Sequence, residues 1–151
     1  MPKVLCATVK PFAPEAVSKI RKIVEDAGYE FALLTHHRKL DRWLQLGGHI
    51  EDDLDILTAA LREAREESGL DEIHPVTDAI FDVDVHPIPA RKQEPEHFHY
   101  DVRFLFQARR GDSLIISDES HDLRWFSIQD LRDLSRDESI DRMVDKMVAL
   151  R

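Results

Sequence analysis

The chain has 151 residues, of which 42% are hydrophobic, and its formal net charge is -9 at pH 7. A chain of this length can bury one sizeable core and is short for two ordinary domains, so we expect a single domain over residues 1–151. The acidic balance argues against a polyanionic partner such as duplex DNA, which needs clustered lysine and arginine. The same acidic charge does not exclude a small nucleotide that binds together with a divalent cation.

Cysteine usage and hydropathy indicate the compartment. Cys6 is the single cysteine, which excludes an internal disulfide framework and fits a reducing environment. We expect it to pack as a small apolar residue. The sequence has no run of 18 apolar residues and no signal-like hydrophobic segment at its beginning. These features predict a soluble, cytoplasmic protein without a membrane partner.

Hydrophobic periodicity and turn residues predict strands and helices along the whole chain. Strands are expected at residues 4–9, 31–35, 43–46, 76–85, 98–108 and 113–116, and a further sheet segment at 123–126. Helices are expected at residues 14–26, 55–68 and 137–150, with Gly69 placed as the C-terminal cap of the second one. Strands with helices packed on both sides predict an α/β sandwich.

Three carboxylates, Glu63, Glu66 and Glu67, fall on one stripe of the predicted helix 55–68, because positions i, i+3 and i+4 are neighbours on a helix. Like charges at this spacing destabilise a helix by about 0.2–0.5 kcal/mol per pair. A bound divalent cation would reverse that sign, since Mg²⁺ prefers carboxylate oxygens. The opposite stripe has ordinary core-facing spacing, so an amphipathic surface helix is the plainer alternative.

A glycine pair precedes this helix and lets the backbone approach a ligand or metal closely. Residues 47–70, GGHIEDDLDILTAALREAREESGL, resemble the Nudix box, the loop-helix signature of hydrolases that cleave nucleoside diphosphates linked to another group. The residues that match the family pattern at its spacing are Gly48, Arg62, Glu63, Ala64, Glu66, Glu67, Gly69 and Leu70.

Leu54 stands where the family pattern has a glutamate. In the family that glutamate is read as a partner of the box arginine, here Arg62, and leucine cannot take this role. Asp53 and Asp55 flank Leu54, and either could reach Arg62 or cap the helix. Two interpretations stay open: an enzyme in which a neighbouring aspartate braces the loop, and a pseudo-enzyme that binds nucleotides with little turnover.

The resemblance implies a Nudix-like α/β/α sandwich with a mixed central sheet, and metal-dependent hydrolysis of a diphosphate linkage in a nucleoside diphosphate derivative. The metal ligands that it implies are the Gly48 carbonyl and the carboxylates of Glu63, Glu66 and Glu67. Carboxylate chemistry favours Mg²⁺, with Mn²⁺ as an alternative. The expected partner is a small-molecule nucleotide substrate, and a homodimer is compatible with the sequence.

The catalytic residues that the resemblance implies are Glu63, Glu66 and Arg62 within the box, and Glu119 as a general base from a loop outside it. Glu96 competes with Glu119 for that role. The isomerase branch of the same fold is a rival enzyme class. It would need a catalytic cysteine in the cleft, and Cys6 is poorly placed for that.

A second informative region is the pair of segments FDVDVHPIP and HFHYDVRFLF, which alternate with a period of 2. One face carries the polar residues Asp82, Asp84, His86, His97, His99, Asp101 and Arg103. The other face is expected in the core and carries Phe98, Tyr100, Val102, Phe104 and Phe106.

We predict that the polar face lines the substrate cleft, because neutral histidine donates and accepts hydrogen bonds and arginine grips phosphate with two. The substrate-binding candidates are His86, His97, His99 and Arg103. A solvated hairpin face is one alternative. A His/Asp metal site of another type is a second, although zinc-type ligand spacing is missing from the sequence.

Overall fold

The computed structural model describes residues 31–53, 55–108, 112–134 and 137–149. The expectations for residues 4–9 and 14–26, for Cys6 and for Leu54 lie outside this part. The described elements are, in chain order, β1 (Phe31–His37), β2 (Arg42–Leu44), α2 (Ile56–Ser68), β3 (His74–Ile88), β4 (His97–Gln107), β5 (Ser120–Ser127), α3 (Ile128–Leu134) and α4 (Glu138–Ala149).

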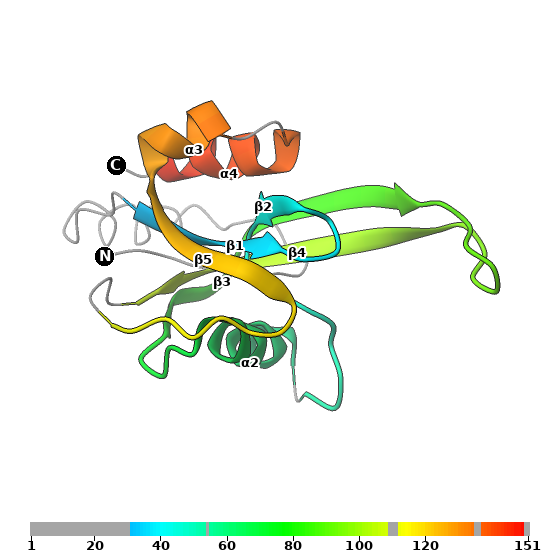
Figure 1. Cartoon of the computed structure of the whole chain (residues 1–151), viewed down its shortest axis with the longest axis horizontal. Helices are drawn as coiled ribbons and strands as arrows, with labels where there is room; N and C mark the ends of the chain where they lie inside the picture. The colour runs from blue at the N-terminus through cyan, green and yellow to red at the C-terminus, as the bar shows by residue number, and fades with distance from the viewer. Residues whose placement is uncertain (1–30, 54, 109–111, 135–136, 150–151) are drawn as a thin grey trace.

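The strands form a middle layer between helices, with α3 and α4 on one side and α2 on the other (Figure 1). Strands β2, β1 and β5 pair antiparallel in that order, and β3 pairs antiparallel with β4. This arrangement confirms the predicted α/β/α sandwich. Within the described residues every strand pair is antiparallel, so the parallel pairing of the expected mixed sheet is not seen there.

Two apolar clusters fill the space on either side of the strands. The cluster under α3 and α4 contains Leu34, Val76, Phe81, Leu105, Ile128, Leu131, Ile140, Met143, Val144 and Met147. The cluster under α2 contains Leu33, Leu46, Ala60, Ala64, Leu70, Ile73, Phe104, Phe106, Ala108 and Leu123. Leu33 and Leu34 enter opposite clusters because successive side chains of a strand point to opposite faces.

The strand predicted at residues 113–116 is not formed. The backbone N–H of Ile115 instead donates to the Ser68 carbonyl at the end of α2, at 2.8 Å. A Cβ at Gly69 would overlap the Ile115 side chain, so this segment crosses directly over the helix cap. The run of apolar residues predicted a strand, but some of these side chains are exposed in the structure. The exposed fraction of Ile115, for example, is 65%.

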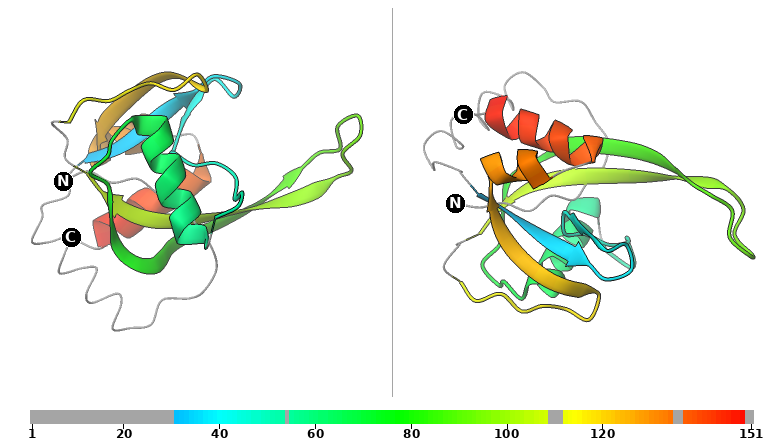
Figure 2. Two further views of the ribbon diagram at one scale, coloured as in Figure 1. Left: turned by 90° about the horizontal axis from the view of Figure 1, so that it is seen from below. Right: turned by 45° about the horizontal axis from the view of Figure 1, so that its top comes forward.

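Strands β3 and β4 continue past the body of the molecule as a projecting hairpin, which we call the arm (residues 85–100; Figures 1 and 2). The prediction that Phe98 and Tyr100 point into the core is wrong, because they are 57% and 65% exposed. Val102, Phe104 and Phe106, further along the same strand, are buried as expected. The alternation is the same throughout, but among the described helices none covers the outer part of the hairpin.

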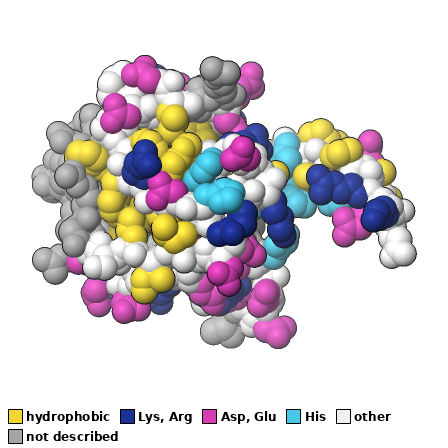
Figure 3. Space-filling view, in the orientation of Figure 1, with side chains coloured by type: hydrophobic (Ala, Val, Ile, Leu, Met, Phe, Trp, Pro, Cys, Tyr) yellow, Lys and Arg dark blue, Asp and Glu magenta, His cyan; other side chains and the backbone are white. Residues whose placement is uncertain are grey.

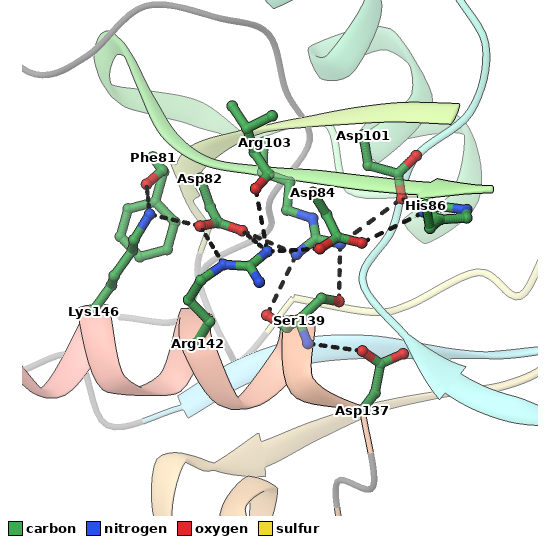
Figure 4. A network of polar contacts seen from close by, with 11 residues as sticks. Phe81, Asp82, Asp84, His86, Asp101, Arg103, Asp137, Ser139, Arg142 and Lys146 are labelled. Carbon is green, nitrogen blue, oxygen red and sulfur yellow. Dashed lines mark hydrogen bonds and ion pairs between the residues drawn. The ribbon is translucent and has the colours of Figure 1, made fainter. Parts of the chain in front are cut away.

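A buried carboxylate joins this hairpin to α4 (Figure 4). Asp82 accepts hydrogen bonds from Lys146 Nζ at 2.6 Å, Arg142 Nη2 at 2.8 Å and Arg103 Nη1 at 3.1 Å. Arg103 is itself buried and donates through Nη2 to Ser139 Oγ at 3.0 Å. Burial would raise the pKa of Asp82, but the hydrogen bonds from Arg142 and Lys146 outweigh it and hold this pKa below its usual range.

Removing the Asp82 carboxylate should therefore destabilise the fold strongly. We expect Asp82→Ala to lower the free energy of unfolding by about 3–5 kcal/mol, the range typical when one partner of a buried ion pair is lost. The control is Asp145→Ala on α4, which breaks an exposed pair with Arg132 on α3 and should cost about 0–1 kcal/mol. Urea denaturation measures both, and equal losses would contradict the structural role of Asp82.

Candidate active site

Helix α2 begins and ends where local sequence chemistry dictates. Asp55 is its N-cap and accepts a hydrogen bond from the Thr58 backbone N–H at 2.9 Å. Gly69 closes the helix in the left-handed conformation with φ 69° and donates to the Arg65 carbonyl. Both ends match the prediction, so the stripe of glutamates is held on a helix of fixed length.

The two aspartates that flank Leu54 divide the two expected roles between them. Asp55 caps α2, whereas Asp53 pairs with Arg62. Arg62 Nη2 and Nε lie 2.9 and 3.1 Å from the two oxygens of Asp53, which is a bidentate arrangement. Arg62 Nη2 also donates to the His49 carbonyl at 3.2 Å. The loop before α2 is therefore braced against the helix by an aspartate.

The three glutamates of the stripe occupy different environments. Glu66 is exposed and lies 3.2 Å from Arg62 Nη1. Glu63 is half-buried and lies 2.8 Å from the same nitrogen. Glu67 is only 6% exposed and accepts a hydrogen bond from the Gly47 backbone N–H at 2.7 Å. The stripe therefore runs from solvent to the interior, toward the glycine pair.

The glycine pair fits closely against these carboxylates. A Cβ added at Gly48 would overlap the carboxylate of Glu63, so a side chain at this position would displace that carboxylate. Gly47 has a φ of 154° and holds Glu67 through its N–H. Carboxylate oxygens packed against backbone at a half-buried position form a set of oxygen donors that fits a hard divalent cation.

The protonation of Glu67 reflects this crowding. Burial raises the pKa of Glu67 to about 7. The hydrogen bond from Gly47 acts in the opposite direction, while the charges of Glu63 and Glu119 raise the pKa further. A cation at this position would favour the ionised form of the carboxylate.

Of the two general-base candidates, Glu119 lies near the box. It sits in the turn before β5, its charge acts on Glu67, and its backbone carbonyl accepts from the Arg38 N–H at 2.9 Å. Glu96 lies in the outer loop of the arm and is exposed. The structure therefore brings Glu119, and not Glu96, toward the glutamate stripe.

A cleft of about 390 Å³ opens between the glycine loop and strand β4. The described residues that line its two sides include Gly47, Gly48, His49, Glu67, Phe98, His99, Tyr100 and Asp101. His99 lies at this cleft, and its contact with substrate stays a prediction. His86 and His97 lie beside it, with ring centroids 5.6 and 5.3 Å from that of His99.

Arg103 does not have the expected environment. Its guanidinium is buried against Asp82 and Ser139, so both ends of the fork are engaged within the fold. The alternation of β4 correctly placed Arg103 on the face of His99, but helix α4 covers that face at residue 103. The structure therefore does not support a phosphate grip by Arg103 and gives it a structural role.

Sequence reasoning missed two residues of the cleft. Phe98 and Tyr100 were assigned to the core, yet both are exposed and line the cleft. The sequence contains a hint of this exposure. Both residues flank His99 in the part of the hairpin richest in histidine, and such a polar segment is unlike a strand that is buried in the core. Exposed aromatic rings at a cleft can stack on planar ligands.

Comparison with known proteins agrees with this geometry. A family model of the NUDIX domain matches residues 20–147. The chain therefore belongs to the Nudix family, and its box places it in the class of Nudix-type pyrophosphohydrolases. None of the curated proteins matches the chain in sequence.

Solved structures of the family share the fold. A C. elegans Ap4A hydrolase in a binary complex superposes with a TM-score of 0.59 at 19% identity, over 78% of this chain and 82% of that one. A NUDIX family hydrolase from Clostridium perfringens gives a TM-score of 0.57 at 22% identity, over 81% and 91%. At these identities the likeness concerns the fold. No helix in the described part of the chain is long and apolar enough to cross a membrane.

The raised pKa of Glu67 predicts a pH-dependent stability. The folded protein keeps a proton on Glu67 that the unfolded chain releases above about pH 4.5, so the metal-free protein should lose stability as the pH rises from about 4.5 to about 7. The full loss is about 3 kcal/mol. Glu67→Gln keeps an acceptor for Gly47 and should remove this loss.

Urea unfolding in a chelator measures the effect at about pH 5 and about pH 8. Wild type and Glu67→Gln should be similar at the lower pH, and the variant should be more stable at the higher one. The control is Glu66→Gln, because Glu66 is exposed on the same helix. If the free energy of unfolding depends on pH in the same way in wild type and in Glu67→Gln, the pKa of Glu67 is not raised by the fold and the prediction is wrong.

Proposed function

We propose that this protein is a divalent-metal-dependent hydrolase that cleaves a diphosphate linkage in a nucleoside diphosphate derivative. The observation that carries the proposal is the packing of Glu63 and Glu67 against the glycine pair, with Arg62 bracing the loop. A solvated surface helix would not bury one of its glutamates against a backbone N–H. The expected cation is Mg²⁺, with Mn²⁺ as an alternative.

The residues that would hold the cation are Glu63, Glu66 and Glu67, together with the Gly48 carbonyl. When bound, the cation would neutralise charge on the phosphoryl oxygens and lower the pKa of the attacking water. The oxygens of Glu67 and Glu63 pack against the glycine loop, so they would hold the cation there, and a diphosphate bound to the cation would lie beside that loop. Glu66, being exposed, would complete the set from the solvent side.

The remaining residues of the site position groups or move protons. Arg62 holds the loop in place through Asp53 and the His49 carbonyl, and so would help to fix the position of the neighbouring Gly48. Glu119 is the general base that we propose, because its charge acts on Glu67 from outside the box. It would accept the proton that the attacking water loses.

The substrate would enter along the cleft between the glycine loop and the arm. Phe98 and Tyr100 expose aromatic rings there, which suit stacking on a nucleobase. His99 supplies an imidazole from the opposite face of β4, and His97 lies beside it. The cleft is open and lined from two sides, so a nucleotide with a second group beyond the diphosphate can be accommodated.

A screen of nucleotide derivatives tests the function. The panel should contain nucleoside diphosphate sugars, dinucleotides and dinucleoside polyphosphates, the last because a structure of similar fold is an Ap4A hydrolase. Each compound is incubated with Mg²⁺ or Mn²⁺, and phosphate or nucleoside monophosphate release is measured. Turnover supports the hydrolase, whereas metal-dependent binding without turnover supports the alternative, a nucleotide-binding module of low activity.

The glutamate stripe yields the first kinetic prediction. On the best substrate, Glu63→Gln, Glu66→Gln and Glu67→Gln should each lower kcat/KM by about 100-fold or more, since even residues behind metal ligands typically cost about 10–100-fold. Loss of like-charge repulsion should leave the helix no less stable. The matched control is Glu72→Gln, an exposed glutamate just beyond α2. Wild-type rates in all three variants would refute the assignment of the metal site.

The pairing of Asp53 with Arg62, which braces the loop before α2, yields the second kinetic prediction. Asp53→Ala should reduce metal affinity and kcat/KM by about 10–100-fold, because Asp53 orients Arg62 and the loop behind the ligands. Asp52→Ala is the control, since Asp52 is exposed and adjacent. Calorimetric titration with Mg²⁺ and steady-state kinetics give the two readouts. Equal behaviour of the two variants would show that Arg62 does not depend on Asp53.

A further inference from the structure

A compact group of metal-ligating side chains lies at the base of the arm, outside the Nudix box. His86 on β3 is the direct cross-strand partner of His99 on β4, so the two imidazoles leave the hairpin on the same face. Asp101 is two residues further along β4 and shares that face. One ligand atom from each of the three lies within 4.8 Å of the others.

These side chains keep free ligating capacity. Among the residues that the structure describes, none hydrogen-bonds to the imidazole of His99, and none donates a hydrogen bond to the carboxylate of Asp101. Asp101 Oδ2 lies 3.8 Å from His86 Nδ1 and 3.8 Å from Arg103 Nη2, both beyond hydrogen-bond distance. All three side chains of the group are half-buried, which limits competition from water without closing the site.

The surroundings stabilise the group without occupying it. Asp84 Oδ2 lies 3.4 Å from His86 Nδ1, and Asp84 Oδ1 accepts from Arg142 Nη2 at 2.9 Å (Figure 4). A carboxylate behind a histidine is the arrangement that fixes the ring orientation of metal-binding imidazoles. Arg103, the cation nearest to Asp101, is engaged by Asp82 and Ser139.

We propose that His86, His99 and Asp101 form a second metal site, which takes a borderline transition cation such as Zn²⁺. Ligand atoms about 2.0–2.2 Å from one ion lie within about 4.4 Å of each other, so the observed spread closes with small side-chain movements. Two neutral imidazoles and one carboxylate suit Zn²⁺, whereas Mg²⁺ prefers oxygen alone. The fourth position is open to water or to an anionic oxygen.

The site would lie at the rim of the cleft. His99 and Asp101 line the same cleft as Gly48 and Glu67. The ring of His49, from the glycine loop, is 6.3 Å from that of His99. Histidine side chains gather where the arm leaves the body in the space-filling view (Figure 3). The cation would leave one net positive charge beside the cleft, which suits a phosphate oxygen. This inference does not depend on the proposed hydrolysis.

Calorimetric titration of the full chain with Zn²⁺, in a large excess of Mg²⁺, tests the proposal. Wild type should bind about one equivalent at this site. A variant that combines Glu63→Gln, Glu66→Gln and Glu67→Gln should still bind it, even though it is expected to be inactive. His86→Ala, His99→Ala and Asp101→Asn should each weaken Zn²⁺ binding by about 10-fold or more.

The matched control is His74→Ala, an exposed histidine at the other end of β3. Circular dichroism shows whether each variant is folded, and His86→Gln replaces His86→Ala if the latter is not. Titration with Co²⁺ adds a visible spectrum that reports nitrogen ligands. Absence of Zn²⁺ binding in wild type under excess Mg²⁺ would overturn the proposal. Loss of binding in the glutamate variant, or equal binding in the hairpin variants and the control, would do the same.

Discussion

The hydrogen bonds of one buried carboxylate, Asp82, hold helix α4 onto the β3–β4 hairpin. A carboxylate taken out of water must keep its cationic partners, because an unpaired buried charge costs several kcal/mol. Arg142 and Lys146 of α4 therefore fix where this helix crosses the hairpin. Helix α4 covers the polar face of the hairpin at Asp82 and Arg103. Toward the tip of the arm the same face is no longer covered by this helix. The positions of the arm, of the cleft beside it and of the histidine group all follow from this crossing.

The sequence predicted best those parts of the site that rest on local chemistry. The extent of α2 follows from its Asp N-cap, its Gly C-cap and its helical periodicity, all within a short stretch of chain. The two roles of Asp53 and Asp55 could be anticipated but not assigned, since either side chain has the same chemistry. The structure assigns them by position: Asp55 directly precedes Ile56 and can only cap, while Asp53 is far enough back to reach Arg62.

Features that depend on distant elements could not be predicted in the same way. Alternation along β4 states which residues share a face, but it does not state what covers that face. Arg103 is buried by residues of α4 that lie more than thirty positions away, and Phe98 is exposed because the covering layer ends before it. Helix α3 was also missed, although Ser127 accepts from the Asp130 N–H as an N-cap does. Its seven residues are too few for a periodic pattern.

The arm has a consequence for how molecules of this protein meet one another. Beyond the body it is a two-stranded ribbon, and among the described residues no third strand pairs with it. Exposed strand edges invite addition of another chain, and thus aggregation. Pro87 lies within β3 and has no N–H to donate, and Pro89 and Pro95 flank a turn that carries Arg91, Lys92 and Glu94. Prolines and charges at the tip oppose strand addition, so the ribbon can remain long and exposed in a crowded solution.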